Sequence, residues 1–146
     1  MRFYPILSAT FVAAVPMTAS SKDPEVIIAN VSVKTLANYT LTYEFDVVDS
    51  LAGQVVHCTG EWDDVNRISS AVPCSVPSYN ASIFFPNSVS STQYWATFIG
   101  IEGRTAEYLA TVQTGTSHYT CGHSGTEGVL SVCFTEPGYE IAATSV

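Results

Sequence analysis

The sequence predicts an all-β fold: a compact antiparallel β-barrel or β-sandwich of seven or eight or more short strands with two local disulfides. Three observations support this fold class. Apolar and polar residues alternate over several short segments, as they do in strands with one buried face, and turn-forming residues separate these segments. No segment beyond the N-terminal region has the 3.6-residue apolar period of a helix. The four cysteines form two closely spaced pairs.

The N-terminal residues indicate a secretory signal peptide. Met1 and Arg2 give a positive start, residues 3–15 are mostly apolar, and small residues allow cleavage after Ala14 or after Ala19. The apolar run is too short to cross a bilayer, and a buried N-terminal strand is the alternative. We therefore expect a signal peptide at 1–19 and a single β-barrel domain at 20–146 with a loose leader at 20–25. The protein is expected to be secreted and extracellular.

The charge balance excludes two classes of partner. The full chain has 5 Lys and Arg against 13 Asp and Glu, a net charge of −8; loss of Arg2 would leave 4 against 13, a net charge of −9. An acidic surface repels phosphate backbones and anionic lipids, so neither nucleic acid nor a membrane surface is an expected partner. The charge suits a soluble protein or one with a basic partner.

The cysteines of an exported chain indicate disulfides rather than a metal site. Four cysteines allow three pairings. We favour Cys58–Cys74 with Cys121–Cys133, because each of these pairs closes a short loop between expected strand ends. Closing loops of this size stabilises a fold by about 3 kcal/mol each.

Three Asn-x-Ser/Thr triplets fit the same export route. They begin at Asn30, Asn38 and Asn80, and they are candidate N-glycosylation sites. Such triplets also arise by chance, so they agree with export without proving it.

Strands are expected at residues 26–34, 40–47, 55–62, 82–85, 94–101, 104–112, 129–134 and 139–144. In the first strand, the odd positions from Ile27 to Val33 are expected to form one apolar face, with Asn30 on the solvent side. In the third, parity places Cys58 inward and His57 outward. The segments 63–72 and 115–128 are expected to be loops, and the last two strands are expected to pair around a turn at 136–138.

The dipeptide Glu102-Gly103 predicts a two-residue hairpin, since glycine readily takes the positive φ that such a turn needs. This turn would pair Ile99 with Ala106 and Thr97 with Tyr108. One face of the hairpin would then belong to the core. The other face is also partly apolar, and we interpret it as an interaction face; coverage by residues 87–92 or by a terminus is the alternative. The interaction face consists of Tyr94, Ala96, Phe98 and Leu109.

Three groups of polar residues are candidates for chemistry, and each has a simpler interpretation. His118, Cys121 and His123 match no zinc-ligand spacing, and Cys121 is expected to be oxidised. Residues 122–126 (Gly-His-Ser-Gly-Thr) lack the final glycine of a nucleophile elbow. An acidic group around Trp62 fits a solvated turn better than a glycosidase pair or a calcium loop. The sequence therefore predicts no catalytic residue, no metal ligand and no cofactor. The acidic group is Glu61, Asp63 and Asp64.

The cysteine spacing and the strand pattern resemble a known family. A Val-x-Val strand precedes residues 43–47 (Tyr-Glu-Phe-Asp-Val), Cys58 and Cys74 are sixteen positions apart, and Cys133 follows Cys121 by twelve. Over roughly residues 31–143, this arrangement is similar to the Alternaria major-allergen-like family of secreted fungal proteins. The resemblance implies a compact β-barrel of two packed antiparallel sheets with two local disulfides.

The resemblance also implies a class of function. Members of the family are described as allergens and as elicitors or effectors that act on plants, and no catalytic residues are established for them. Some members form a covalent dimer through an N-terminal cysteine. This chain has no cysteine before Cys58, so any homodimer is expected to be non-covalent. His118 and His123 depart from the family pattern near the last two cysteines, so ligand preferences are not carried over.

These features together predict a secreted, acidic, non-catalytic binding or effector protein, glycosylated if its sequons are used. Its expected partner is an extracellular protein of a plant host or a small aromatic ligand. The alternatives are a secreted hydrolase and a structural protein of the cell wall or surface. A hydrolase would use either the acidic group around Trp62 or His118 and His123 with Ser124.

Overall fold

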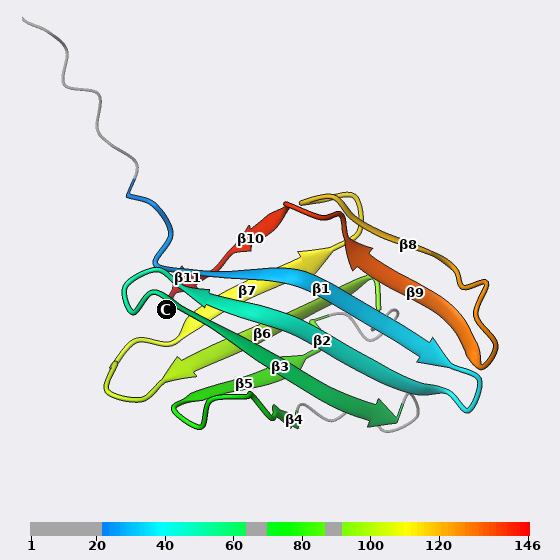
Figure 1. The fold of residues 1–146 in the computed structure, drawn as a ribbon, viewed down its shortest axis with the longest axis horizontal. Helices are drawn as coiled ribbons and strands as arrows, with labels where there is room; N and C mark the ends of the chain where they lie inside the picture. Colours follow the sequence, from blue (N-terminus) through cyan, green and yellow to red (C-terminus); the bar gives the residue numbers. More distant parts are fainter. Residues whose placement is uncertain (1–21, 64–69, 87–91) are drawn as a thin grey trace, which may run out of the picture.

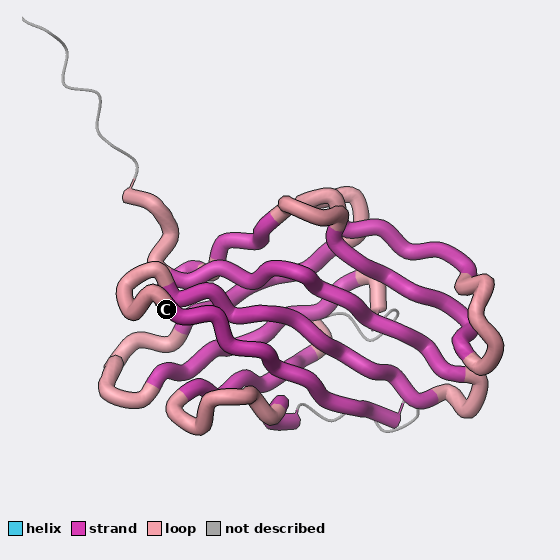
Figure 2. Tube along the Cα trace, viewed as in Figure 1, coloured by secondary structure: helices cyan, strands magenta, loops and turns pink. Residues whose placement is uncertain are grey.

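The computed structural model describes residues 22–63, 70–86 and 92–146. Every regular element within these ranges is a strand, as Figure 2 shows. No helix in the described part of the chain is long and apolar enough to cross a bilayer. The predicted signal peptide, Asp64 and most of the loop expected at 87–92 lie outside the described residues. The strands are β1 (Val26–Leu36), β2 (Thr40–Asp49), β3 (Gln54–Asp63), β4 (Ser70–Val72), β5 (Tyr79–Phe84), β6 (Tyr94–Ile101), β7 (Tyr108–Gln113), β8 (Tyr119–His123), β9 (Val129–Thr135), β10 (Glu140–Ala142) and β11 (Thr144–Ser145).

The strands form two antiparallel sheets that pack face to face (Figure 1), which confirms the predicted fold class. Sheet A has the order β3-β2-β1-β9-β8, and sheet B has the order β11-β7-β6-β5-β4. The short strand β10 also pairs with β1, on the side opposite β2. Two sheets packed on their apolar faces account for the alternating pattern along the chain.

Both sides of the two-sheet structure are joined, so it approaches a closed barrel. On one side, β1 pairs with β9 over its second half and with β10 over its first half, and the chain then passes from β10 into β11, which pairs with β7 of sheet B. On the other side, residues 73–75 follow β4 of sheet B and hydrogen-bond to β3 of sheet A. Joining the sheets in this way leaves fewer unpaired strand edges.

Aromatic side chains from both sheets meet in the core. Tyr43 of β2 lies edge-on to Trp95 of β6, with ring centroids 5.1 Å apart, and edge-on to Trp62 of β3 at 5.2 Å. Phe45 of β2 lies 5.9 Å from Trp95. Such aromatic pairs contribute about 0.5–1.5 kcal/mol beyond the area they bury. The alternation of β2 therefore delivers the side chains that bind the two sheets together.

Tyr119 anchors β8 in the same core. Its hydroxyl donates a hydrogen bond to the Thr92 carbonyl oxygen at 2.6 Å, and the Trp95 indole nitrogen donates to that hydroxyl at 3.4 Å. Burial raises the pKa of Tyr119 well above its ordinary value. The phenol therefore stays protonated and links β8 in sheet A to the start of β6 in sheet B.

The two predicted disulfides are present. Cys58 in β3 is bonded to Cys74, and Cys121 in β8 is bonded to Cys133 in β9. All four cysteines of the sequence are therefore paired, and the predicted pairing is confirmed. The first bond joins the edge of sheet A to the segment that follows β4 of sheet B, and the second joins neighbouring strands within sheet A.

The predicted parity of the first strand is wrong for its first half. Val26 and Ile28 are buried in the core, and after a bulge between Ala29 and Ser32 the core side passes to Val31 and the odd positions. The extra residue of a bulge shifts the alternation by one. Asn30 occupies the bulge with φ at 50°, and it is exposed as expected.

The turn predicted at Glu102-Gly103 forms, with Gly103 at φ 85° and the Arg104 amide donating to the Ile101 carbonyl oxygen at 3.0 Å, but the predicted register of the two strands is wrong. The observed register pairs Ile99 with Tyr108 and Thr97 with Ala110, and β7 begins only at Tyr108. The connection is six residues, 102–107, because Arg104 leaves the sheet to reach a buried carboxylate described below. A shift of two residues keeps each side chain on its predicted face.

The C-terminal third differs from expectation in two ways. β9 pairs with β1 and β8 instead of forming a hairpin with the strand predicted at 139–144, and that strand divides into β10 and β11 in different sheets. Residues 119–123, expected to be part of a loop, form β8. The glycine- and serine-rich composition of 115–128 conceals this strand, which its disulfide and Tyr119 hold in place.

Replacing Cys58 and Cys74 by alanine is expected to lower the free energy of unfolding by about 3 kcal/mol, since the bond closes a loop with a sequence separation of 16. Urea denaturation followed by tryptophan fluorescence measures this. The matched double variant Cys121→Ala/Cys133→Ala, with a separation of 12, should lose a similar or smaller amount. An unchanged midpoint for the first variant would contradict the assignment of Cys58–Cys74 as a joint between the sheets.

Candidate functional site

The predicted interaction face lies on the side of sheet B that points away from the core, which we call the outer face. Tyr94, Phe98 and Leu109 each lie on it and are half-buried, while their strand neighbours are buried against sheet A. Ala96 lies on the same face but is only 1% exposed, because in register it falls between the larger side chains of Phe84 and Thr111. Ala96 is therefore part of the face without offering contact surface.

The structure adds Phe84 of β5 to this face. Its ring stacks on that of Phe98, with centroids 5.0 Å apart and an interplanar angle of 23°. Both rings are half-buried, so each keeps an edge or face open to solvent. Sequence reasoning missed Phe84 because it placed β5 at 82–85 without pairing it to β6. The stacked pair and Leu109 form a continuous apolar strip across β5, β6 and β7.

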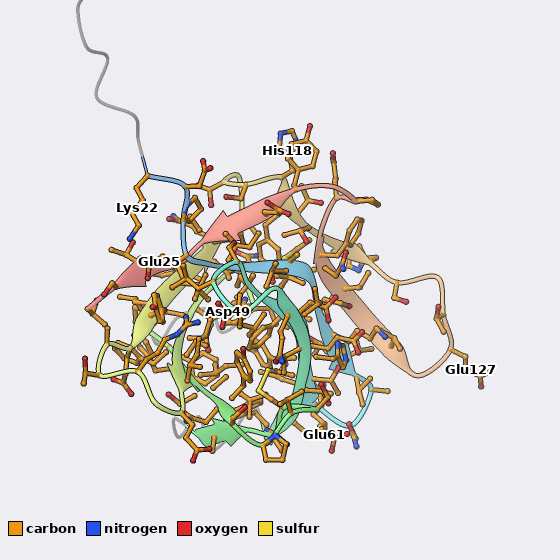
Figure 3. All side chains as sticks on the ribbon, turned by 60° about the vertical axis from the view of Figure 1, so that its left-hand side comes forward. Lys22, Glu25, Asp49, Glu61, His118 and Glu127 are labelled. Atoms are coloured by element: carbon orange, nitrogen blue, oxygen red, sulfur yellow. A yellow bond between two sulfur atoms is a disulfide. The ribbon has the colours of Figure 1, made fainter. Side chains whose placement is uncertain are left out.

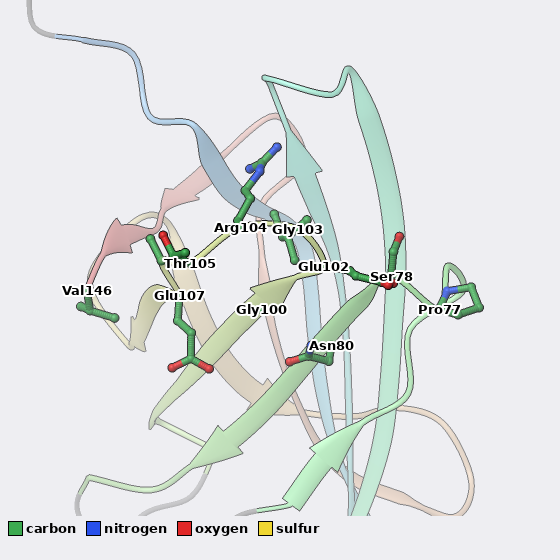
Figure 4. Close-up of a pocket in the computed structure, with 12 residues that line it drawn as sticks. Pro77, Ser78, Asn80, Gly100, Glu102, Gly103, Arg104, Thr105, Glu107 and Val146 are labelled. Carbon is green, nitrogen blue, oxygen red and sulfur yellow. The ribbon is translucent and has the colours of Figure 1, made fainter.

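An open groove of about 610 Å³ lies at the end of the sheet where β6 passes into the β6–β7 loop (Figure 4). Its floor is Gly100, and Asn80 lies across that floor: a Cβ atom on Gly100 would sit 2.6 Å from the Asn80 side-chain oxygen. Glu102 and Glu107 from the β6–β7 loop and Val146 near the C-terminus also line it. The absence of a side chain at Gly100 leaves the space that the Asn80 amide occupies.

Registers place the groove and the strip on one surface. Asn80 is opposite Gly100, while Ser82, Phe98 and Leu109 form the next row along the sheet. Neighbouring rows on one face lie about 7 Å apart along the strands. A ligand in the groove would therefore reach the aromatic pair, and we treat the groove and the strip together as the candidate site.

A buried ion pair fixes the loop that forms the groove wall. Asp49 at the end of β2 is fully buried, and Arg104 Nη2 donates to both of its carboxylate oxygens at 2.8 and 2.7 Å. Figure 4 shows the Arg104 side chain pointing away from Glu107 and Asn80. The positive charge of Arg104 therefore neutralises Asp49 and not Glu102 or Glu107 in the groove.

The other partners of Asp49 complete its hydrogen bonding. The Tyr79 hydroxyl donates to it at 2.8 Å, and the backbone amides of Leu51 and Ala52 donate at 3.1 and 3.2 Å. Burial by itself raises the pKa of Asp49, but the hydrogen bonds from Arg104 and Tyr79 outweigh it and leave the pKa below its ordinary value. Burial and then the bond to Asp49 raise the pKa of Tyr79. Asp49 is therefore held ionised between the sheets.

The same network reaches the start of the described chain. Arg104 Nη1 donates to the Tyr108 hydroxyl at 3.4 Å, and this hydroxyl donates to Glu25 at 2.9 Å. Lys22 forms an ion pair with Glu25, and Figure 3 shows these two side chains beside each other on the segment that enters β1. Glu25 is therefore tied to sheet B just before the chain enters β1.

Of the acidic group predicted around Trp62, the structure describes the side chain of Glu61. Glu61 is exposed on β3, its partner across the sheet is Thr42, and Asp63 ends the strand. Asp64 lies outside the described residues. The structure shows Glu61 on an open sheet surface next to a threonine, which agrees with a solvated position.

The two C-terminal histidines are not brought together. His118 precedes β8 and His123 ends it, so about 16 Å of extended strand separates them. His118 stacks on Tyr139 with ring centroids 3.5 Å apart. The Ser124 hydroxyl accepts a hydrogen bond from the Thr126 amide at 3.0 Å. Figure 3 places Glu61 and His118 at separate positions on the periphery.

Besides the Asp49 network, the structure reveals a second polar cluster that was not predicted from the sequence. His57 Nδ1 lies 2.7 Å from one Asp46 carboxylate oxygen, and the Asn30 amide donates to the other at 2.8 Å. The pairing of Asp46 with His57 follows from the β2–β3 register, which the turn at 50–53 could have indicated. No group of three or more His, Cys, Asp or Glu side chains among the described residues could hold a metal ion.

A second apolar surface lies on the outside of sheet A. Leu130 and Phe134 of β9 are 46% and 42% exposed, and Val132 lies between them on the same side of the strand. These residues belong to the other sheet, whereas Phe98 and Leu109 lie one row along sheet B from Gly100 in the groove. Leu130 and Phe134 provide chemically matched control positions for tests of the candidate site.

No family model, curated protein or solved structure matches this chain. The resemblance drawn from cysteine spacing therefore stays a prediction.

Replacing Arg104 by methionine is expected to lower the free energy of unfolding by about 3 kcal/mol, because it leaves the Asp49 charge buried without its partner. The double variant Asp49→Asn/Arg104→Met should lose less than Arg104→Met, since it removes the unpaired charge as well. Urea denaturation of the three proteins measures the coupling between the two residues. Equal losses for the single and the double variant would show that Asp49 does not depend on Arg104.

The depressed pKa of Asp49 also predicts a pH dependence. Its contribution to stability is complete above the ordinary aspartate pKa of about 4 and is lost as the pH falls through the lower value in the folded protein. The wild type should therefore lose stability more steeply below about pH 4 than Asp49→Asn. Urea midpoints measured between neutral and strongly acidic pH test this, and parallel curves for the two proteins would contradict it.

Proposed function

We propose that this protein is a secreted, non-catalytic binding module that holds a small uncharged aromatic molecule on the outer face of sheet B. The observation that carries the proposal is that the apolar strip of Phe84, Phe98 and Leu109 lies on the same face as a groove of about 610 Å³, with Phe98 one row along the sheet from Gly100. Ligand sites combine apolar contact surface with a few polar groups that fix orientation. Here the aromatic pair offers stacking surface, and Asn80 and the backbone around Gly100 offer hydrogen-bonding groups.

The charge distribution favours an uncharged ligand over an anion. The full chain has a net charge of −8, and Glu102 and Glu107 line the groove. Arg104 lines it too, but its guanidinium is bound to Asp49. An aromatic anion would meet unfavourable potential at this surface, whereas a neutral ring would not.

Export and a role outside the cell are supported by the cysteines. Both disulfides form in the fold, and such bonds persist in oxidising compartments. The same cysteine spacing underlies the resemblance to secreted fungal proteins that act on plants, so a host-directed effector role is part of the proposal. The separation of His118 from His123 by β8 supports binding over hydrolysis by that pair.

The neutral fluorescent amine N-phenyl-1-naphthylamine is a suitable probe. We expect unglycosylated protein to bind it, and Phe98→Glu and Leu109→Lys each to weaken binding about tenfold or more, which corresponds to about 1.4 kcal/mol. The physical reason is that each variant places a charge in the apolar strip. A fluorescence titration gives the dissociation constants, and sedimentation velocity shows any change in association state.

The outside of sheet A supplies matched controls. Phe134→Glu and Leu130→Lys make the same chemical changes at exposed positions of β9 and should leave probe binding unchanged. If neither Phe98→Glu nor Leu109→Lys alters binding or association in folded protein, the outer face of sheet B is not the binding site.

A further inference from the structure

The three sequons occupy different places in the fold. Asn38 lies in the turn between β1 and β2, where its side-chain oxygen accepts a hydrogen bond from the Thr40 amide and its nitrogen has no hydrogen-bond partner in the part of the chain that the structure describes. Asn30 lies in the β1 bulge, and its side-chain nitrogen donates to Asp46. Asn80 lies within β5, on the outer face of sheet B. Only Asn80 among them touches the candidate site.

The first and third residues of the Asn80 sequon lie on the outer face of sheet B. Asn80 lies over Gly100 in the groove, Ala81 points into the core, and Ser82 returns to the outer face opposite Phe98. Asn80 is exposed, and its amide has no hydrogen-bond partner among the described residues. Its nitrogen can therefore carry a substituent without loss of a hydrogen bond. At Asn30, a sugar on the nitrogen would disturb the bond to Asp46.

We propose that Asn80 carries an N-linked glycan that covers the groove and the aromatic pair, so that glycosylated and unglycosylated forms differ in access to the outer face of sheet B. Diagonal neighbours across two antiparallel strands lie about 7–8 Å apart. Phe98 has this relation to Asn80, because Phe98 pairs with Ser82 and Gly100 pairs with Asn80. The first sugars of a glycan on Asn80 therefore lie against Phe98 and over the Gly100 floor.

The modification needs one co-reactant, an oligosaccharide linked to a lipid diphosphate. The Asn80 side-chain nitrogen forms a bond to the anomeric carbon of the first sugar. The bond between that carbon and the diphosphate oxygen breaks, the lipid diphosphate leaves, and the nitrogen loses one proton. The acceptor triplet is Asn80, Ala81 and Ser82.

Whether the glycan covers the outer face of sheet B does not depend on the proposed function. Whether the glycan controls ligand binding does rest on the proposed function. The experiment uses the full chain secreted from a yeast host, with Ser82→Ala as the variant that keeps Asn80 but removes the sequon. Ser82→Thr keeps an acceptor triplet, because threonine also completes it, and it serves as the conservative variant. Thr40→Ala removes the Asn38 sequon and is the matched control, because a glycan in that turn lies away from the groove.

Peptide mass spectrometry first locates the glycans. Hydroxyl-radical footprinting then measures solvent access at Phe84 and Phe98. We expect a glycan on Asn80 in the wild type and in Ser82→Thr, with labelling of both rings several-fold lower than in Ser82→Ala. Thr40→Ala should be labelled like the wild type. An unmodified Asn80, or equal labelling of the wild type and Ser82→Ala, would overturn the proposal; Asn80→Gln repeats the comparison if Ser82→Ala folds poorly.

Binding of N-phenyl-1-naphthylamine separates the two proposals. Binding by wild type freed of its glycans with a glycosidase, and loss of binding in the glycosylated wild type, support both. No binding by the folded, deglycosylated wild type rejects the aromatic-ligand function, and footprinting still decides whether the glycan covers the face. Equal binding by the glycosylated and unglycosylated proteins would show that the glycan does not control access, and it would support the binding function.

Discussion

The ion pair between Asp49 and Arg104 is the constraint on which the architecture at the groove end of the molecule depends. Asp49 is fully buried at the end of β2, and a buried carboxylate needs both a counter-charge and hydrogen bonds. Arg104 and Tyr79 supply them from sheet B. The arginine must leave the strand to do so, and this requirement lengthens the β6–β7 connection and forms one wall of the groove.

Closure of the barrel depends on a second local feature, the bulge in β1. The bulge changes which residues of β1 face the core, and the partner of β1 changes from β9 to β10 along the same edge. The chain can then cross into sheet B through β11. On the opposite side, Cys58–Cys74 fastens the segment after β4 to β3. The two sheets are thus joined by backbone pairing on one side and by a covalent bond with backbone pairing on the other.

The outer face of sheet B is unusual because its apolar strip points away from a core that is already complete. Phe84 and Phe98 stack on each other and not on sheet A. In the adjoining groove, the Asn80 amide lies over Gly100, which has no side chain, and Arg104 turns towards Asp49. Asn80 lies where the groove meets the strip, so one side chain can govern access to the whole surface. The binding and glycan proposals therefore concern the same few residues.

The sequence by itself determined the fold class, the disulfide pairs and most strands, because alternation and short cysteine loops are local signals. The alternation of β2 also indicated that Asp49 points inward. The apolar side chains of the outer face were likewise visible in the sequence. Tertiary structure decided the rest. The pairing of β10 and β11, the strand at 119–123, the stacking of Phe84 on Phe98 and the partner of Arg104 depend on contacts between residues far apart in the chain. No local pattern specifies these contacts, since each forms only when two sheets bring distant strands into register.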